Sequence, residues 1–327
     1  MAQALVGLGS NIGDRQALLN RAVAELAASP HTTVLRTSRW LETQPVGGAP
    51  GQGEYLNGAV LLETSFTPQA LHSRLKEIEA ALGRARHERW GSRTIDLDLL
   101  LFDDLICRTP SLTLPHPRMA FRKFVIAPAA EIAPEMVHPA IGWSLSTLLM
   151  HLHTAPPYVA VSSICLAETR TLVSEVARET GWNEFDLPAG PEALLTNVPP
   201  SPPVAEAIEF LVARTKLLNG KLRKAVEAGE TISSFWLESI LAFGEVFWPG
   251  TLAEVWQAVE PVLIQPKLTV IYEVDSATGI ADDVFQKLNA AQRVRAKRLG
   301  IGPVLWLDAN SPKEAVAELT AAIQAME

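Results

Sequence analysis

A loop rich in arginine, followed at once by an acidic strand, is the feature of this sequence most able to do chemistry. The apolar run over residues 94–102 has the composition of a largely buried strand, and it carries Asp96 and Asp98. Alternation along a strand puts both carboxylates on one face, about 6.5–7 Å apart. The preceding residues, 83–93, hold Arg84, Arg86, Arg89, Trp90 and Arg93.

Two carboxylates on one apolar strand repel each other unless a cation lies between them. Mg²⁺ is usually held by one or two carboxylates together with phosphate oxygens, and arginines bind phosphates bidentately. The pattern therefore predicts phosphoryl or pyrophosphoryl transfer from a nucleotide. The alternative is an edge strand whose aspartates point into water beside a solvated basic loop. A bare Asp-x-Asp pair favours that alternative, whereas the added arginines favour the site.

Five further motifs accompany this loop, and together they carry a family resemblance. The motifs are Gly7–Asp14, Glu42–Gly47, Tyr55–Val60, Leu114–Met119 and Phe121–Val125. On these motifs, from about Ala4 to about Leu152, the chain resembles the 6-hydroxymethyl-7,8-dihydropterin pyrophosphokinases.

The resemblance implies transfer of pyrophosphate from ATP to the hydroxymethyl group of the pterin, a step of folate biosynthesis that releases AMP. Asp96 and Asp98 match the aspartates that hold two Mg²⁺ ions, and Arg84 and Arg93 match catalytic arginines. The implied pterin-binding residues are Thr43, Val46, Tyr55, Asn57 and Phe124. The implied ATP-binding residues are Arg84, Arg86, Trp90, Arg93, Leu99, Thr113, His116 and Arg122.

Each of these positions also has an ordinary interpretation. A flat heteroaromatic ring stacks well between aromatic faces, but Tyr55 and Phe124 are equally consistent with core aromatics. Asn57 alone suggests a turn residue, and His116 between two prolines suggests a rigid loop. Their combined occurrence favours the site. One position departs from the family: Ser111 stands where an arginine is common, with Arg108 nearby, and we expect weaker stabilisation of transition-state charge.

Composition excludes several other classes of protein. The 327 residues predict two domains, and the 48% of hydrophobic residues suffice for a sizeable core. A net charge of −8 argues against non-specific nucleic-acid binding, and 2 cysteines argue against a disulfide framework. No apolar run reaches the roughly 20 residues of a membrane span, and no basic-then-apolar leader opens the sequence. We therefore expect a cytoplasmic protein with small-molecule substrates.

The first domain is predicted over residues 1–154 as strand, helix, strand, strand, helix, strand. A glycine-rich turn over Gly7–Asp14 is expected to open the first helix. Thr67 as N-cap, Pro68 at the first helical position and Gly83 at the end delimit the second. Two helices on a mostly antiparallel sheet indicate a ferredoxin-like α+β fold, which is also the family's fold.

The second domain is predicted over residues 155–327, after Pro156 and Pro157. It begins with a strand and a helix, the arrangement that holds a P-loop, and it resembles deoxynucleoside kinases, which implies an α/β P-loop-kinase-like fold with a parallel sheet. The motif itself is degenerate. Ser163 and Glu168 replace its glycines and Thr169 replaces its lysine, so we expect no kinase activity. The basic residues Arg293, Arg295 and Arg298 match the kinase lid loosely and suit a solvated helix face better.

An aromatic stretch in this domain raises the question of self-association. The helical spacing of its aromatic residues predicts that most of them are buried in the core. Any of these side chains that remain exposed on one helix face could form a homodimer interface. The stretch contains Phe235, Trp236, Phe243, Phe247 and Trp248.

Three functions are consistent with the whole sequence. The first, which we favour, is a pyrophosphokinase whose second domain is structural, oligomerising or regulatory. The second is a bifunctional enzyme that retains nucleoside kinase activity, and the third is a non-catalytic pterin or nucleotide sensor.

Overall fold

The computed structural model describes most of the chain, in two compact units. One unit comprises Met1–His153 with Ala321–Glu327, and the other comprises Thr154–Thr320. The described residues are 1–48, 51–83, 93–186, 203–234, 236, 238–275, 282–298 and 300–327, without the side chains of residues 166, 238, 240, 243 and 252.

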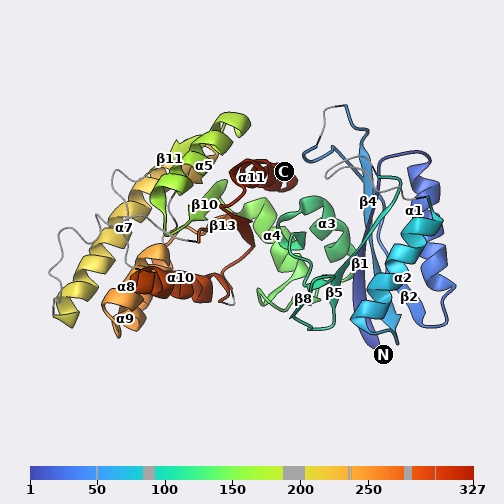
Figure 1. Ribbon diagram of the computed structural model, residues 1–327, viewed down its shortest axis with the longest axis horizontal. Helices are drawn as coiled ribbons and strands as arrows, with labels where there is room; N and C mark the ends of the chain where they lie inside the picture. The colour runs from blue at the N-terminus through green and yellow to red at the C-terminus, as the bar shows by residue number, and fades with distance from the viewer. Residues whose placement is uncertain are drawn as a thin grey trace. The chain divides into compact units, whose positions relative to one another are not determined.

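The first unit is built on a five-stranded sheet whose paired strands are all antiparallel (Figure 1). The strand order is β2-β4-β1-β5, and β3 pairs with β4. This arrangement confirms the predicted antiparallel α+β architecture. The strands are β1 (Ala2–Ser10), β2 (Thr32–Thr37), β3 (Leu41–Thr43), β4 (Tyr55–Thr64) and β5 (Asp96–Phe102).

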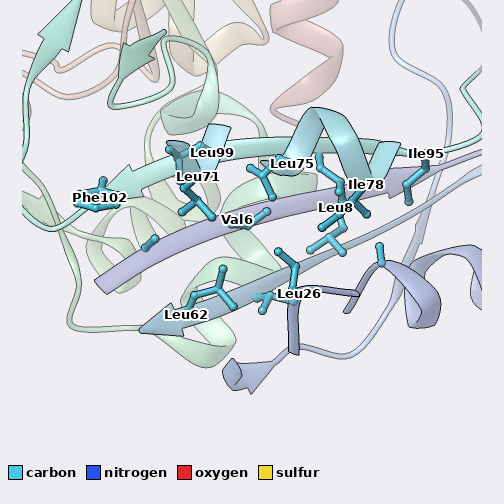
Figure 2. Packing of buried hydrophobic residues seen from close by; sticks show 14 of the residues in the cluster. Val6, Leu8, Leu26, Leu62, Leu71, Leu75, Ile78, Ile95, Leu99 and Phe102 are labelled. Atoms are coloured by element: carbon cyan, nitrogen blue, oxygen red, sulfur yellow. The ribbon is translucent and has the colours of Figure 1, made fainter. Parts of the chain in front are cut away.

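Two helices cover one face of this sheet, α1 (Arg15–Ala27) and α2 (Pro68–Ala81). Asp14 and Thr67 cap them by accepting backbone N–H groups in the first turn. Leucine and isoleucine side chains from α2 interlock with alternate residues of β1, β4 and β5, as Figure 2 shows. The helix-covered core therefore contains Val6, Leu8, Leu26, Leu62, Leu71, Leu75, Ile78 and Leu99.

The opposite face packs against α3 (Lys123–Ile132), which contacts β1, β3 and β4. Shorter elements complete this unit: β6 (Cys107–Arg108) paired with β7 (Thr113–Leu114), η1 (Met119–Phe121), β8 (Val137–His138) paired with β9 (Trp143–Ser144), and α4 (Leu145–Thr154).

The glycine-rich turn predicted over Gly7–Asp14 is wrong in its first half. Gly7 and Gly9 lie within β1, and the chain leaves the strand only after Ser10. Buried Val6 and Leu8 alternate with the two glycines, so the period of two continues to the strand's end. A Cβ at Gly9 would lie 3.0 Å from Asn57 Oδ1, so this glycine serves a close approach rather than a turn.

The second unit is built on a five-stranded sheet in which every pairing is parallel. Its order is β11-β12-β10-β13-β14, which agrees with the predicted parallel sheet. The strands are β10 (Tyr158–Ser162), β11 (Asn183–Phe185), β12 (Thr231–Ser233), β13 (Leu268–Glu273) and β14 (Val304–Asp308). The helical elements are α5 (Leu166–Thr180), α7 (Val204–Ala228), α8 (Glu238–Phe247), α9 (Leu252–Val259), η2 (Glu260–Val262), α10 (Asp282–Ala296) and α11 (Pro312–Ala325).

The aromatic stretch of this unit contributes to its interior. Trp236 belongs to the main core, and Trp248 packs against that core with its ring edge-on to Phe210. Phe247 packs against a smaller cluster around Phe285. Phe235 and the side chain of Phe243 fall outside the described residues. Self-association through this stretch remains a prediction.

Nothing in the described part of the chain could cross a membrane as a helix.

His138 provides a test of how burial affects stability. Burial lowers the pKa of His138 to about 4, below the ordinary value near 6.5 that the unfolded chain keeps. Between pH 6.5 and pH 4 the unfolded chain therefore binds a proton at His138 that the folded chain does not bind. The free energy of unfolding falls over this range, by about 2 kcal/mol at pH 5.

We expect His138→Gln to lose less stability than the parent between pH 7.5 and pH 5, measured as the shift in urea midpoint. Exposed His153 gives the matched control, His153→Gln, which should follow the parent. Equal shifts in the parent and in His138→Gln would contradict the prediction.

Candidate active site

The two aspartates lie on the sheet face opposite α1 and α2. Leu97 and Leu99 point into the helix-covered core, so alternation turns Asp96 and Asp98 to the other side. The register places Asp96 opposite Gly9 and Asp98 opposite Gly7 on β1. Gly9 is in turn opposite Asn57 on β4. Because Gly9 has no side chain, the Asp96 carboxylate and the Asn57 amide flank an open strip of backbone.

Asp98 is surrounded by positive charge. Burial by itself would raise the pKa of Asp98, but His116, Lys76, Arg122 and Arg93 together hold that pKa below its usual range. His116 Nε2 lies 3.9 Å from Asp98 Oδ2. The Asp98 carboxylate is therefore ionised at neutral pH and suited to a cation.

His116 is fixed beside β5 by main-chain contacts. Its N–H donates to the Leu100 carbonyl at 2.9 Å, and its Nδ1 accepts the Arg118 N–H at 3.3 Å. Burial lowers the pKa of His116 to about 4, so the ring is neutral at pH 7. With Nδ1 accepting, the ring proton resides on Nε2, the nitrogen nearest Asp98.

Arg93 contacts Asp96 through a charge-assisted hydrogen bond from Nη1. Burial disfavours the Arg93 charge, but Asp96 outweighs burial and raises the pKa of the guanidinium. For Arg122 the effects that disfavour the charge are larger: burial and nearby Arg118 lower its pKa to about 10. The guanidinium is still charged at pH 7.

Ser10 and Asn11 hold the Arg93 segment, a role that the sequence did not indicate. Asn11 Oδ1 accepts the Arg93 N–H at 2.6 Å, and the Asn11 N–H donates to the Arg93 carbonyl at 3.1 Å. Ser10 Oγ donates to the Thr94 carbonyl at 2.6 Å. The available signal was the Gly-Ser-Asn run at a strand end, since short polar side chains commonly bond nearby backbone.

The residues predicted for the pterin lie on β4, β3 and the start of α3. Tyr55 is opposite Thr43 in the β3–β4 pairing, and Asn57 Nδ2 donates to Thr43 Oγ1 at 2.8 Å. Burial raises the pKa of Tyr55, with Arg93 and Asp96 as its charged neighbours. The structure thus brings Thr43, Tyr55 and Asn57 together.

The other predicted ligand residues are distributed around this strip. Phe124 stands in the first turn of α3 with the Arg122 guanidinium 5.7 Å from its ring centroid. Half-buried Val46 follows β3, and Thr113 is in β7 opposite Arg108. The Leu99 side chain is buried in the core, so a ligand could reach only its main chain. Arg84, Arg86 and Trp90 fall outside the described residues.

Comparison with known proteins gives the family. The model of the 7,8-dihydro-6-hydroxymethylpterin-pyrophosphokinase (HPPK) family matches residues 5–134. A 2-amino-4-hydroxy-6-hydroxymethyldihydropteridine pyrophosphokinase of Synechocystis is 44% identical over 146 residues, which are 45% of this chain and 74% of that protein. The chain belongs to the HPPK family. The Bacillus subtilis pyrophosphokinase is 47% identical over 133 residues, 41% of this chain and 79% of that protein.

The HPPK match ends before the second unit begins. In structure, the C-terminal part of the chain resembles deoxyadenosine kinase from M. mycoides, at 14% identity and a TM-score of 0.38, over 50% of this chain and 96% of that one. Plasmodium falciparum HPPK-DHPS gives 10% identity and a TM-score of 0.37, over 88% of this chain and 70% of that one. At these TM-scores neither likeness bears on function.

In the second unit, the residues at the position of the degenerate P-loop form hydrogen bonds and an ion pair with neighbouring residues. Thr169 is fully buried, and its Oγ1 donates to the Cys165 carbonyl at 2.7 Å. Arg170 pairs with Asp186 at 2.8 Å, and Asp186 also accepts the Ser234 hydroxyl at 2.6 Å. The lid arginines also have partners.

Two of those arginines face carboxylates and the third stacks on an aromatic ring: Arg293 lies 2.7 Å from Glu273, Arg295 lies 3.9 Å from Glu245, and the Arg298 guanidinium lies 4.0 Å from the Trp256 ring centroid.

The donor set of the HPPK unit fits a divalent cation of the Mg²⁺ type. Asp96 and Asp98 offer carboxylate oxygens on one face, and the surrounding arginines fit the phosphates that such a cation usually accompanies. Carboxylate oxygen ligands favour a hard metal ion such as Mg²⁺, whereas thiolate ligands would favour a softer one.

Arg93 offers a test of this electrostatic arrangement. If Arg93 binds the transferring phosphates, as the family resemblance implies, we expect Arg93→Gln to lower kcat by about 10²–10³-fold because a preorganised charge is lost. Steady-state kinetics with both substrates would measure it, with exposed Arg39→Gln, which pairs with Glu131, as the control. A change in kcat no larger than that of the control would contradict the prediction.

Proposed function

We propose that this chain transfers pyrophosphate from ATP to the hydroxymethyl group of 6-hydroxymethyl-7,8-dihydropterin, giving the pterin diphosphate and AMP in folate biosynthesis. The observation that carries the proposal is the strip on the open sheet face. There the Arg93-paired Asp96 lies across Gly9 from Asn57, and the ionised Asp98 lies opposite Gly7, in a chain of the HPPK family.

The proposed chemistry uses few groups. The hydroxymethyl oxygen of the pterin attacks the β-phosphorus of ATP, the bond from that phosphorus to the α,β-bridging oxygen breaks, and AMP leaves. Two Mg²⁺ ions, held by Asp96 and Asp98, would neutralise charge on the phosphate oxygens. Arg93, Arg122 and the loop arginines Arg84 and Arg86 would bind the phosphates. Positioning and electrostatics suffice for such transfers, so no strong general base is required.

The pterin would lie beside the β3–β4 pairing. Asn57 both donates and accepts, which suits the edge of a pterin, and Thr43 already fixes its amide orientation. The Tyr55 and Phe124 rings would stack on the heterocycle, with Val46 lining the pocket. ATP would contact His116, Thr113, the main chain of Leu99 and Trp90. A cytoplasmic location follows from these soluble substrates.

The deciding experiment measures AMP release by the full chain with ATP, Mg²⁺ and 6-hydroxymethyl-7,8-dihydropterin. We expect AMP only when the pterin is present. A folded protein that binds both ligands yet releases no AMP would leave the sensor interpretation instead.

For the predicted second domain, residues 155–327, we propose a structural, oligomerising or regulatory role on a P-loop-kinase-like fold. Two contacts support this proposal: Thr169 donates to the Cys165 carbonyl, and Arg170 pairs with Asp186. The glycines of a P-loop, whose backbone N–H groups could bind phosphates, are replaced in this segment. Incubation of the full chain with ATP and each deoxynucleoside should give no nucleotide product. Light scattering on the full chain would test for the homodimer.

A further inference from the structure

A carboxylate on the covering helix reaches the outer edge of the strand that carries the aspartates. Glu79 lies near the end of α2 and is 2% exposed. Its Oε1 accepts the Leu97 N–H at 2.7 Å, and Lys76 Nζ lies 3.1 Å from its Oε2. A buried carboxylate is costly unless hydrogen bonded and paired, and Glu79 has both kinds of partner.

The contact falls between the two proposed metal ligands. Leu97 separates Asp96 from Asp98, and β5 is the last strand in the order of its sheet, so among the described residues its outward main-chain groups face no further strand. At that edge Glu79 accepts the Leu97 N–H, and the His116 main-chain N–H donates to the Leu100 carbonyl. The segment that orients both carboxylates is thereby fixed from the side opposite β1.

We propose that Glu79 is a positioning residue for the aspartate pair, and that its hydrogen bond to Leu97 holds Asp96 and Asp98 at the spacing a divalent cation requires. This inference rests on the proposed function. Groups outside the ligand set tune metal affinity because they orient the ligands, and Glu79 would do so through the main chain between Asp96 and Asp98.

The test uses two substitutions of similar size. Glu79→Met removes the acceptor but keeps the volume, whereas Glu79→Gln keeps an acceptor for the Leu97 N–H. Exposed Glu77, which pairs with Arg74 on the same helix, gives the control Glu77→Gln. Isothermal titration calorimetry measures Mg²⁺ binding to the full chain in the presence of α,β-methylene-ATP, and a second titration measures pterin binding.

We expect Glu79→Met to weaken Mg²⁺ binding about tenfold, as loss of an outer partner of a metal ligand does, with pterin affinity unchanged. Glu79→Gln should restore most of the Mg²⁺ affinity. A methionine variant with parental Mg²⁺ affinity, or a glutamine variant as defective as methionine, would overturn the proposal.

The melting temperatures of the variants and the second substitution keep the outcome decisive. Melting temperatures separate loss of folding from loss of metal affinity. If Glu79→Met does not fold, Glu79→Gln decides alone: near-parental Mg²⁺ affinity supports the proposal, and a tenfold loss of the kind expected for methionine overturns it. Because binding is measured without turnover, failure here differs from a parent protein that lacks pterin-dependent AMP release, which would be failure of the proposed function.

Discussion

Asp98→Asn is expected to lower pyrophosphoryl transfer by about 10³-fold while the protein stays folded. The Asp98 carboxylate is ionised because the positive charges around it overcome burial, so its charge is available to a cation. An amide of the same shape removes that charge and leaves the charged Lys76 and Arg122 to repel the metal ion. The measurement is pterin-dependent AMP release at saturating ATP, with Mg²⁺ varied.

The control for this substitution is Asp104→Asn, in the exposed turn directly after β5. It changes the net charge equally but lies off the open face, so its activity should equal that of the parent. Asp96→Asn should resemble Asp98→Asn and also free Arg93. If Asp98→Asn keeps activity close to that of Asp104→Asn, the aspartates do not hold the metal and the site must be placed elsewhere.

The elements of the first unit could be predicted because their signals are local. Thr67, Pro68 and Gly83 delimit α2 within the chain itself, and the apolar run over residues 94–102, whose side chains alternate with the period of two of a strand, predicts β5. The shared face of Asp96 and Asp98 follows from that period alone. The parallel sheet that contains β10 and β13 was instead implied by the resemblance of this half to deoxynucleoside kinases.

Contacts between distant segments could not be predicted in the same way. Gly7 and Gly9 fit either a turn or a strand, and only pairing with β4 and β5 decides for the strand. Glu79 has the sequence surroundings of a solvated helix acid, yet the path of β5 beneath α2 buries it. The clamp of Asn11 on Arg93 joins residues 82 positions apart, a pairing that no local pattern encodes.

The second large effect is expected from Gly9→Val, which should reduce kcat/KM for the pterin by at least about 10²-fold, since misplacing a reacting group by an ångström has that effect. Even a Cβ at Gly9 would lie 3.0 Å from Asn57 Oδ1 and 4.0 Å from the Tyr55 ring. The two γ-methyls of valine would fill the strip between Asn57 and Asp96. Valine is favourable in strands, so the defect should arise in the site rather than in the fold.

Gly7→Ala is the matched control, because Gly7 points to the same face one pair further along β1. A Cβ there would meet the Leu100 side chain at 3.2 Å, and a flexible leucine can move where the Thr43-bound amide of Asn57 cannot. Gly9→Ala should fall between the control and valine in pterin affinity, while all three variants should bind ATP comparably. Normal pterin affinity in a folded Gly9→Val would show that the substrate does not use the strip between Asp96 and Asn57, and would move the pterin pocket away from β1.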